Sequence, residues 1–229
     1  MGLLSSKDTK NNDELAYNFH FPTSKSALII FTKNPELGKC KTRLAKTIGN
    51  EAALHVYTLL LKHTAKITTP IKTDKFVFYS NKILHNDFWD ENIFKKRLQQ
   101  GHNLGERMEN AFLELFQSGY EKIIIIGSDL YDLTSEVINV AFETLNNHDH
   151  VIGPATDGGY YLLGMKSPHP TIFKNKQWST ASIYKDTLND LKQNTVYILK
   201  KLNDIDTFED LKAHNKLINA IPRNYDKTY

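Results

Sequence analysis

The chain has very little cysteine: one residue, Cys40, among 229. A single cysteine cannot form a disulfide within the chain or supply a multi-cysteine zinc site. Disulfides persist mainly in oxidising compartments. Their exclusion here favours the reducing cytoplasm, and we predict a cytoplasmic protein.

Long hydrophobic runs are also missing. No apolar stretch approaches the roughly 20 residues that a membrane-spanning helix needs, and residues 1–25 contain no apolar segment of the secretory-signal kind. Residues 1–25 are polar and aperiodic, which predicts a flexible N-terminal arm. No repeat, low-complexity tract or linker divides the remainder, so we expect a single domain over residues 26–229.

Neither sign of charge is in large excess. Lys and Arg number 29, Asp and Glu number 26, and the formal net charge is +3. This near-balance argues against a protein that coats nucleic acid or binds membranes through a polybasic surface. A local basic pocket remains compatible with it, because totals do not show clustering.

Among the features that are present, the most informative is a run of four isoleucines at 123–126 that leads through Gly127 and Ser128 to Asp129. Such a run is typical of a central strand in a mostly parallel sheet that is covered on both faces. Ligands of open α/β sheets bind at the carboxyl ends of the strands. Asp129 is therefore a candidate ligand of a divalent metal that holds nucleotide phosphates; the alternative is that it only starts a turn.

A second apolar run, at 27–31, predicts another buried strand, and a basic loop over residues 32–43 follows it. The loop contains Lys33, Lys41 and Arg43, and Gly38 lets backbone amides approach a ligand closely. Fixed cations and amides beyond a strand end suit a pyrophosphate, although the spacing of a Walker A loop is absent. The alternative is a solvated basic turn.

Strand-like and helix-like segments alternate through the rest of the chain. Helical spacing predicts helices at about 50–67 with Asn50 as the cap, at 104–116, after Thr134, around 183–191 and after a capping box at Thr207 and Asp210. Sequence propensity predicts strands at 75–79, 150–153, 160–165 and 195–199, and a short helix with an edge strand within 81–97. This alternation predicts a three-layer α/β domain.

Three further segments carry candidate site residues. A glycine-rich loop with Gly101, Gly105 and Arg107 enters a predicted helix; its N-terminus could meet an anion, or the glycines only shape the loop.

The second segment contains Asp157, Gly158, Gly159 and Tyr160. The glycine pair permits close approach of another molecule, which Asp157 could hydrogen-bond or deprotonate; the alternative is a hairpin turn. Trp178 lies in a later loop and is a candidate acceptor-binding residue; the alternative, which is more common for a tryptophan, is a core residue.

The third segment is the stretch before the final capping box. Capping explains Thr207 and Asp210 but leaves Asp204 and Asp206 without a role. Alternate residues of an extended segment project to the same side, so these two aspartates could share one target. Mg²⁺ or Mn²⁺ prefers such carboxylate oxygens and keeps several waters.

Several of these motifs together resemble one family. They are residues 31–44, 127–129, 153–161 and 204–211, with 104–108 and 178–180 fitting as well. The chain resembles the GT-A-like glycosyltransferase family labelled radical-SAM/selenodomain-associated transferase 1, which is similar to the molybdenum-cofactor and 2-phospholactate guanylyltransferases. One departure is that Leu130 and Tyr131 stand where that family usually has a Cys-Pro pair, which affects the loop shape and the choice of acceptor.

The resemblance implies a Rossmann-like nucleotide-diphospho-sugar transferase (GT-A) fold that binds a nucleotide sugar or a nucleoside triphosphate. By motif, the phosphate loop would be Lys33, Gly38, Lys41 and Arg43; the metal contacts would be Asp129, Asp206 and Asp204; the acceptor side would be residues 157–160.

The function expected on this basis is a metal-dependent glycosyl transfer from a nucleotide sugar to a small-molecule acceptor, with Asp157 activating the acceptor hydroxyl. The alternatives are a nucleotidyltransferase, guanylyltransferase-like, that acts on a phosphorylated small molecule, and a non-catalytic nucleotide-binding protein. No nucleic-acid partner and no membrane span are expected, and a homodimer is left open.

Overall fold

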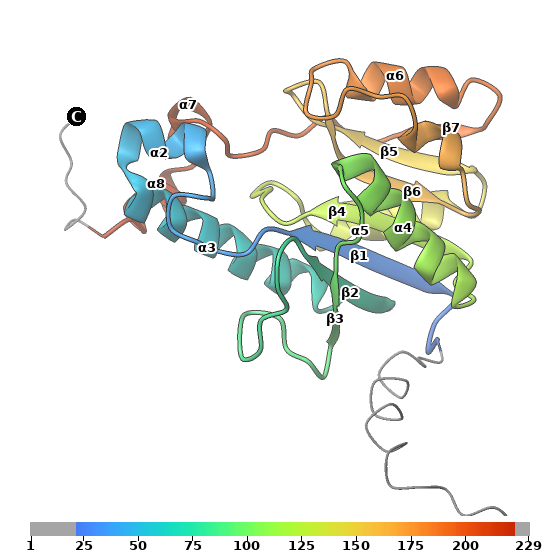
Figure 1. Ribbon diagram of the computed structural model, residues 1–229, viewed down its shortest axis with the longest axis horizontal. Helices are drawn as coiled ribbons and strands as arrows, with labels where there is room; N and C mark the ends of the chain where they lie inside the picture. The colour runs from blue at the N-terminus through green and yellow to red at the C-terminus, as the bar shows by residue number, and fades with distance from the viewer. Residues whose placement is uncertain (1–21, 223–229) are drawn as a thin grey trace, which may run out of the picture.

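A computed structural model describes residues 22–222 of the chain. These residues form a seven-stranded sheet in the order β3-β2-β1-β4-β6-β5-β7 (Figure 1). The strands are β1 (Ser26–Thr32), β2 (Asp74–Tyr79), β3 (Phe94–Leu98), β4 (Lys122–Gly127), β5 (His150–Pro154), β6 (Tyr160–Met165) and β7 (Val196–Ile198). Only β6 runs antiparallel to its neighbours, so the prediction of a mostly parallel sheet is confirmed.

The strand order reverses between β1 and β4. From β1 the chain builds outward through β2 to β3, then returns to place β4 on the other side of β1. β1 and β4 are paired in parallel with Phe31 opposite Gly127, so both strands end at the same edge. Such a switch point is where open α/β sheets bind their ligands, and the basic loop and Asp129 both start there.

Helices cover both faces of the sheet. Consecutive residues of a strand point to opposite faces, so a continuous apolar strand needs packing partners on both. Leu28 and Ile30 of β1 pack with α3 (Asn50–Thr68) and α5 (Ser135–Thr144). Ile29 packs on the other face with α4 (Leu104–Gln117), the 3₁₀ turn η1 (Pro170–Phe173) and α6 (Ile183–Asp190). The predicted three-layer architecture is therefore confirmed.

A third apolar cluster joins the two ends of the described chain. It packs α2 (Thr42–Ile48) and the outer side of α3 against α7 (Phe208–Lys212) and α8 (Asn215–Asn219), around Leu44, Val56, Ile205 and Leu211. Figure 1 shows α2, α7 and α8 together beside α3. This cluster fixes the basic loop next to the aspartates that precede α7.

Two local predictions are corrected. Residues 81–93 form bends and turns with no helix, although the edge strand that was expected after them is present as β3. Asn50 is the first residue of α3, and Gly49 is its N-cap. Of the predicted arm, residues 1–21 lie outside the described residues, and the Thr23 N–H donates to Asp74 at the start of β2.

Within residues 22–222, no helix is long and apolar enough to cross a membrane.

Candidate functional site

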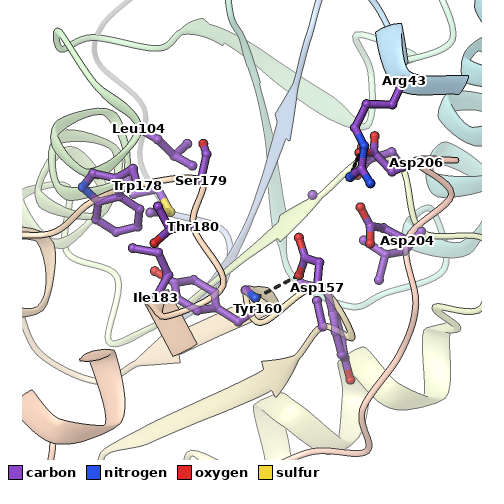
Figure 2. Close-up of a pocket in the computed structure, with 17 residues that line it drawn as sticks. Arg43, Leu104, Asp157, Tyr160, Trp178, Ser179, Thr180, Ile183, Asp204 and Asp206 are labelled. Carbon is purple, nitrogen blue, oxygen red and sulfur yellow. Dashed lines mark hydrogen bonds and ion pairs between the residues drawn. The ribbon is translucent and has the colours of Figure 1, made fainter. Parts of the chain in front are cut away.

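A cavity of about 520 Å³ opens at the carboxyl edge of the sheet. Its lining divides by residue type into two groups; in Figure 2 Arg43, Asp204 and Asp206 of one group lie opposite Leu104, Trp178 and Ile183 of the other. We call one the charged half, which consists of Arg43, Asp129, Asp157, Asp204 and Asp206. We call the other the apolar half, which consists of Leu104, Met108, Tyr160, Trp178 and Ile183.

The centre of the charged half is an ion pair at the switch point. The Lys41 Nζ lies 2.7 Å from Asp129 Oδ2 and 3.6 Å from Asp206 Oδ1, and the Lys41 side chain is only 4% exposed. Burial by itself lowers the pKa of Lys41, but the facing carboxylates, chiefly Asp129, outweigh it and raise that pKa above its ordinary value. Lys41 is a fixed cation in a pocket of carboxylates.

The backbone at Lys41 is strained in a way that is common at functional sites. Lys41 adopts a left-handed conformation with φ of 49° immediately before α2. Residues other than glycine rarely do so, and such residues cluster at binding and catalytic sites. The conformation accompanies a side chain that is buried against Asp129.

A buried hydroxyl network lies beneath this ion pair. The Ser128 Oγ donates to Thr32 Oγ1 at 3.1 Å, which ties the end of β4 to the end of β1. The Tyr57 hydroxyl of α3 donates to the Lys33 carbonyl at 3.0 Å and accepts the Lys33 N–H at 3.0 Å. These bonds fix the backbone on both sides of the switch point, from which Lys41 and Asp129 extend.

Asp206 links the C-terminal segment to the basic loop. Its Oδ2 lies 3.0 Å from an Arg43 guanidinium nitrogen, while its Oδ1 faces Lys41. The predicted capping box at α7 is present, because Asp210 accepts the Thr207 N–H at 2.7 Å and Thr207 accepts the Asp210 N–H. Asp210 also accepts from the Asp206 N–H at 3.2 Å, so the cap positions the metal candidate as well as the helix.

Asp204 lies half-buried beside these groups. Burial, followed by the charges of Asp129 and Asp157, raises its pKa to about 6, with Lys41 acting in the opposite direction. Burial, the largest of these causes, disfavours the charged form of the Asp204 carboxyl group, and a cation bound nearby would favour that form.

Asp157 stands at the turn between β5 and β6, between the two halves of the cavity (Figure 2). Its Oδ1 accepts the Gly159 N–H at 2.9 Å, which holds the carboxylate in place. The predicted hairpin is present and Asp157 also lines the cavity, while its contact with an acceptor stays a prediction. Gly158 has φ of 90°, and a Cβ there would lie 2.2 Å from the Ala181 carbonyl oxygen, so the close neighbour is the chain itself.

Trp178 belongs to the cavity wall and to the core at once. Its indole packs against the apolar cluster that α4 forms with the sheet, and it also lines the cavity. A Cβ on Gly105 would lie 2.3 Å from the indole Nε1, so Gly105 provides the space in which the indole rests. This contact gives Gly105 a role that the sequence did not suggest.

The remaining predicted phosphate-binding residues lie outside this cavity. Lys33 and Gly38 are exposed in the loop after β1. The Arg107 Nε donates to the Gly101 carbonyl at 3.0 Å, and Asn103 caps α4 by accepting from Glu106. Gly101 and Arg107 therefore shape the loop through their mutual hydrogen bond, and their binding of an anion stays a prediction.

The carboxylates of the charged half fit a hard divalent cation by their chemistry. Asp129 and Asp206 already converge on one positive group, the Lys41 ammonium. Within residues 22–222, no set of three His, Cys, Asp or Glu side chains is placed closely enough to hold a metal alone. Mg²⁺ sites of nucleotide enzymes commonly use one or two carboxylates and complete the shell with phosphates and water.

Sequence reasoning missed the residues that support the site. Thr32, Tyr57 and Ser128 form the network beneath the ion pair, and Leu104 and Met108 line the apolar half. Tyr57 was the available signal, because it places a hydroxyl within the apolar stripe of α3. Leu104 and Met108 gave none, since they read as ordinary core positions.

Comparison with family models gives one match. The model described as "Uncharacterized protein conserved in bacteria (DUF2064)" matches residues 64–180, just over half of the chain. The chain belongs to this family. The matched segment carries Asp129, Asp157 and Trp178, whereas Lys41, Arg43 and Asp206 lie outside it. A comparison with curated proteins found no match.

Solved structures give a closer comparison. The "putative nucleotide-diphospho-sugar transferase from Desulfovibrio desulfuricans G20" is 31% identical, with a TM-score of 0.79, over 89% of this chain and 92% of that chain. The 4-diphosphocytidyl-2C-methyl-D-erythritol synthase of Anaerococcus prevotii has a TM-score of 0.55 at 10% identity, over 85% and 96% of the two chains.

A cytidylyltransferase of Leptospira borgpetersenii has a TM-score of 0.54 at 12% identity, over 82% of this chain and 83% of that chain. At such identities the last two structures establish the fold alone. The chain therefore has the α/β fold of nucleotide-diphospho-sugar transferases and cytidylyltransferases.

Proposed function

We propose that this DUF2064 protein is a metal-dependent glycosyltransferase that uses a nucleotide-sugar donor. The observation that carries the proposal is the convergence of Lys41, Asp129 and Asp206 at the switch point of the sheet. The similarity to the Desulfovibrio protein, which is named for nucleotide-diphospho-sugar transfer, supports this donor class.

The basic residues would bind the diphosphate of the donor. Arg43 is 64% exposed at its side chain and lines the cavity, so its guanidinium can reach a ligand and form paired hydrogen bonds to phosphate oxygens. Lys41 would supply a second, preorganised cation. Fixed cations at the leaving group stabilise charge that develops in the transition state, because they need no reorganisation during the reaction.

Asp129 and Asp206, with Asp204 nearby, would hold Mg²⁺ or Mn²⁺. A metal ion bound there would act as a Lewis acid for the departing diphosphate. When the two carboxylates serve as metal ligands, Lys41 loses part of its pairing and becomes available to phosphate oxygens.

In the transfer, a bond forms between the acceptor oxygen and the anomeric carbon while the bond from that carbon to the diphosphate oxygen breaks. The electron pair leaves with the nucleoside diphosphate. Asp157 would accept the proton of the acceptor hydroxyl, because it lies at the boundary of the charged half and is held there by Gly159.

The proposal is tested by a thermal-shift panel of nucleotide sugars, nucleoside diphosphates and triphosphates, with and without Mn²⁺. A ligand at 100 times its dissociation constant stabilises a protein by about 2.7 kcal/mol. We expect the largest shift with a nucleotide sugar plus Mn²⁺, followed by turnover when an acceptor is present.

A larger shift with triphosphates would favour a nucleotidyltransferase instead, and binding without turnover across a broad acceptor panel would favour a non-catalytic protein.

The variant Arg43→Ala tests the phosphate contact. A charge-assisted hydrogen bond contributes about 1.5–3 kcal/mol, so nucleotide affinity should fall about ten- to a hundredfold with little change in melting temperature. Lys39→Ala is the matched control, because Lys39 lies in the same loop but pairs with Glu36 on the surface. Equal nucleotide affinity in both variants, measured by calorimetry, would return the loop to a structural role.

A further inference from the structure

Three large apolar side chains form one wall of the apolar half of the cavity. Leu104 begins α4, Trp178 and Ile183 lie in one later segment, and the three side chains gather on one side of the cavity in Figure 2. Leu104 is 42% exposed and lines the cavity. The wall therefore presents apolar surface to whatever enters the cavity.

Two glycines hold this wall in position. The indole of Trp178 rests on Gly105, where any side chain would overlap it. The segment after Trp178 is pressed against the β5–β6 turn, since the Gly158 carbonyl accepts the Tyr184 N–H at 3.0 Å and Ala181 lies directly over Gly158. Residues 178–184 thus form a rigid strap between α4 and the turn that carries Asp157.

The strap also carries backbone strain. Ser179 has φ of 64°, in the left-handed region that side-chain-bearing residues rarely occupy. The Thr180 hydroxyl donates to the Gln177 carbonyl at 2.7 Å, which holds the bend closed. Both residues line the cavity, and strain of this kind persists where the surrounding structure enforces it.

The charges of the cavity lining disfavour a second anion in the apolar half. Arg43 is the only Lys or Arg among the described residues that line the cavity, and it lies in the charged half against Asp206. Asp157 and Asp204 also line the cavity. A phosphate or carboxylate placed against Trp178 would therefore have no lysine or arginine of the apolar half to pair with.

The position of Asp157, the proposed proton acceptor, indicates where the acceptor substrate would bind. Asp157 lies in the β5–β6 turn and Tyr160, three positions later, is the first residue of β6 and belongs to the apolar half. A donor anchored at Lys41 and Arg43 approaches from the side of β1 and α2. The acceptor hydroxyl must reach Asp157 from the other side, where the apolar wall stands.

We propose that the apolar half binds the acceptor, and that this acceptor is an uncharged molecule that presents a hydroxyl group beside a flat apolar ring. The ring would lie on Trp178, and the hydroxyl would point to Asp157. This inference rests on the proposed glycosyl transfer, and it excludes the phosphorylated acceptors that a nucleotidyltransferase of small molecules would use.

The test uses three probes that share one ring: 4-(trifluoromethyl)benzyl alcohol, its phosphate ester, and 4-(trifluoromethyl)benzoate. Binding to the full chain is measured by ¹⁹F NMR in the presence of Mg²⁺ and the best-binding nucleoside diphosphate from the panel above. We expect the neutral alcohol to bind at least about tenfold more tightly than either anion. Binding of the phosphate ester as tightly as the alcohol would overturn the proposal.

Two variants connect the binding to the wall. Trp178→Ala should weaken the alcohol about tenfold and leave the nucleoside diphosphate affinity unchanged. Gly105→Ala should do the same, because its methyl group displaces the indole although alanine favours the helix. Glu109→Ala, on the same helix and outside the cavity lining, is the control and should bind the alcohol normally.

The outcomes separate the two proposals. Loss of nucleoside diphosphate affinity in Trp178→Ala, measured without any probe, would assign the apolar half to the nucleobase and overturn this inference alone. Failure of wild-type protein to bind any nucleotide would overturn the proposed function itself. Normal nucleotide binding with no preference for the alcohol would overturn only the acceptor assignment.

Discussion

The carboxylates at the two edges of the sheet differ in the kind of group that they contact. At the amino edge, Asp74 is 8% exposed and accepts hydrogen bonds from the Thr23 N–H and hydroxyl and from the Tyr120 hydroxyl, with Lys95 3.4 Å away. At the carboxyl edge, Asp129 and Asp206 are held mainly by the cations of Lys41 and Arg43.

The pKa directions record this difference. Burial alone would raise the pKa of Asp74, but hydrogen bonds from Thr23 and Tyr120 outweigh it and hold that pKa far below its usual range. The pKa of Asp204 is raised to about 6 by burial and by neighbouring acids. A carboxylate with all its bonds made contributes to stability, whereas one left short of partners is available to a ligand.

The largest expected effect on stability is at the amino edge of the sheet, where Asp74 lies. Asp74→Ala removes the acceptor of three hydrogen bonds and leaves the buried Tyr120 hydroxyl without it. We expect a loss of about 3 kcal/mol, or about 6–12 °C in melting temperature for a domain of this size, with nucleotide affinity retained. A melting temperature within a degree of wild type would mean that the two edges do not differ as described.

A smaller effect tests where the domain begins. Deleting residues 1–21 leaves Thr23 in place, whereas deleting residues 1–24 removes both of its hydrogen bonds to Asp74. We expect only the longer deletion to lower stability, by about 1–2 kcal/mol in thermal unfolding, because Thr23 is exposed and water replaces part of the contact. Equal melting temperatures would place the boundary at residue 26.

The smallest expected effect on stability is at the carboxyl edge of the sheet, at Asp204. A raised carboxyl pKa contributes stability at low pH that is lost as pH rises through the folded value, here from about 4 to above 6. Asp204→Asn should therefore stabilise the chelator-treated protein above pH 6, by about 1 kcal/mol after allowance for solvent screening, and have no such benefit near pH 4. For Asp74 the sign is opposite, since its stabilisation is lost as pH falls below about 4.

The sequence predicted the long regular elements better than the short or irregular segments. Strands such as 123–126 and the stripe of α3 were predictable, because a buried element must be apolar on the face it buries. The segment 81–93 was not, since its aromatic residues have no period, and Trp89 packs on Phe94 within a coil. α2 was missed because its first two residues, Thr42 and Arg43, lie within the predicted basic loop.

In the site, residue types were predictable and pairings were not. Lys41, Arg43 and Asp129 were found by their positions after strands. Their contacts, Lys41 with Asp129 and Arg43 with Asp206, span 88 and 163 residues of sequence. The two glycines show the limit most clearly. Gly105 and Gly158 suggested room for a ligand, yet the structure fills that room with the chain's own Trp178 and Ala181. A glycine shows that something approaches, without showing what.

The central claim is that Asp129 holds a metal ion for a nucleotide, and Asp129→Asn tests it most directly. The variant keeps the size of the side chain, and Asp206 remains 3.6 Å from Lys41 as a counter-ion, so the protein should stay folded with a modestly lower melting temperature. Asp132→Asn, three residues on and facing His214, is the matched control.

Calorimetric titration of the nucleoside diphosphate, with saturating Mn²⁺ and then with chelator, compares the three proteins. We predict that Mn²⁺ increases nucleotide affinity in wild type and Asp132→Asn but not in Asp129→Asn. The same increase in all three proteins would contradict it.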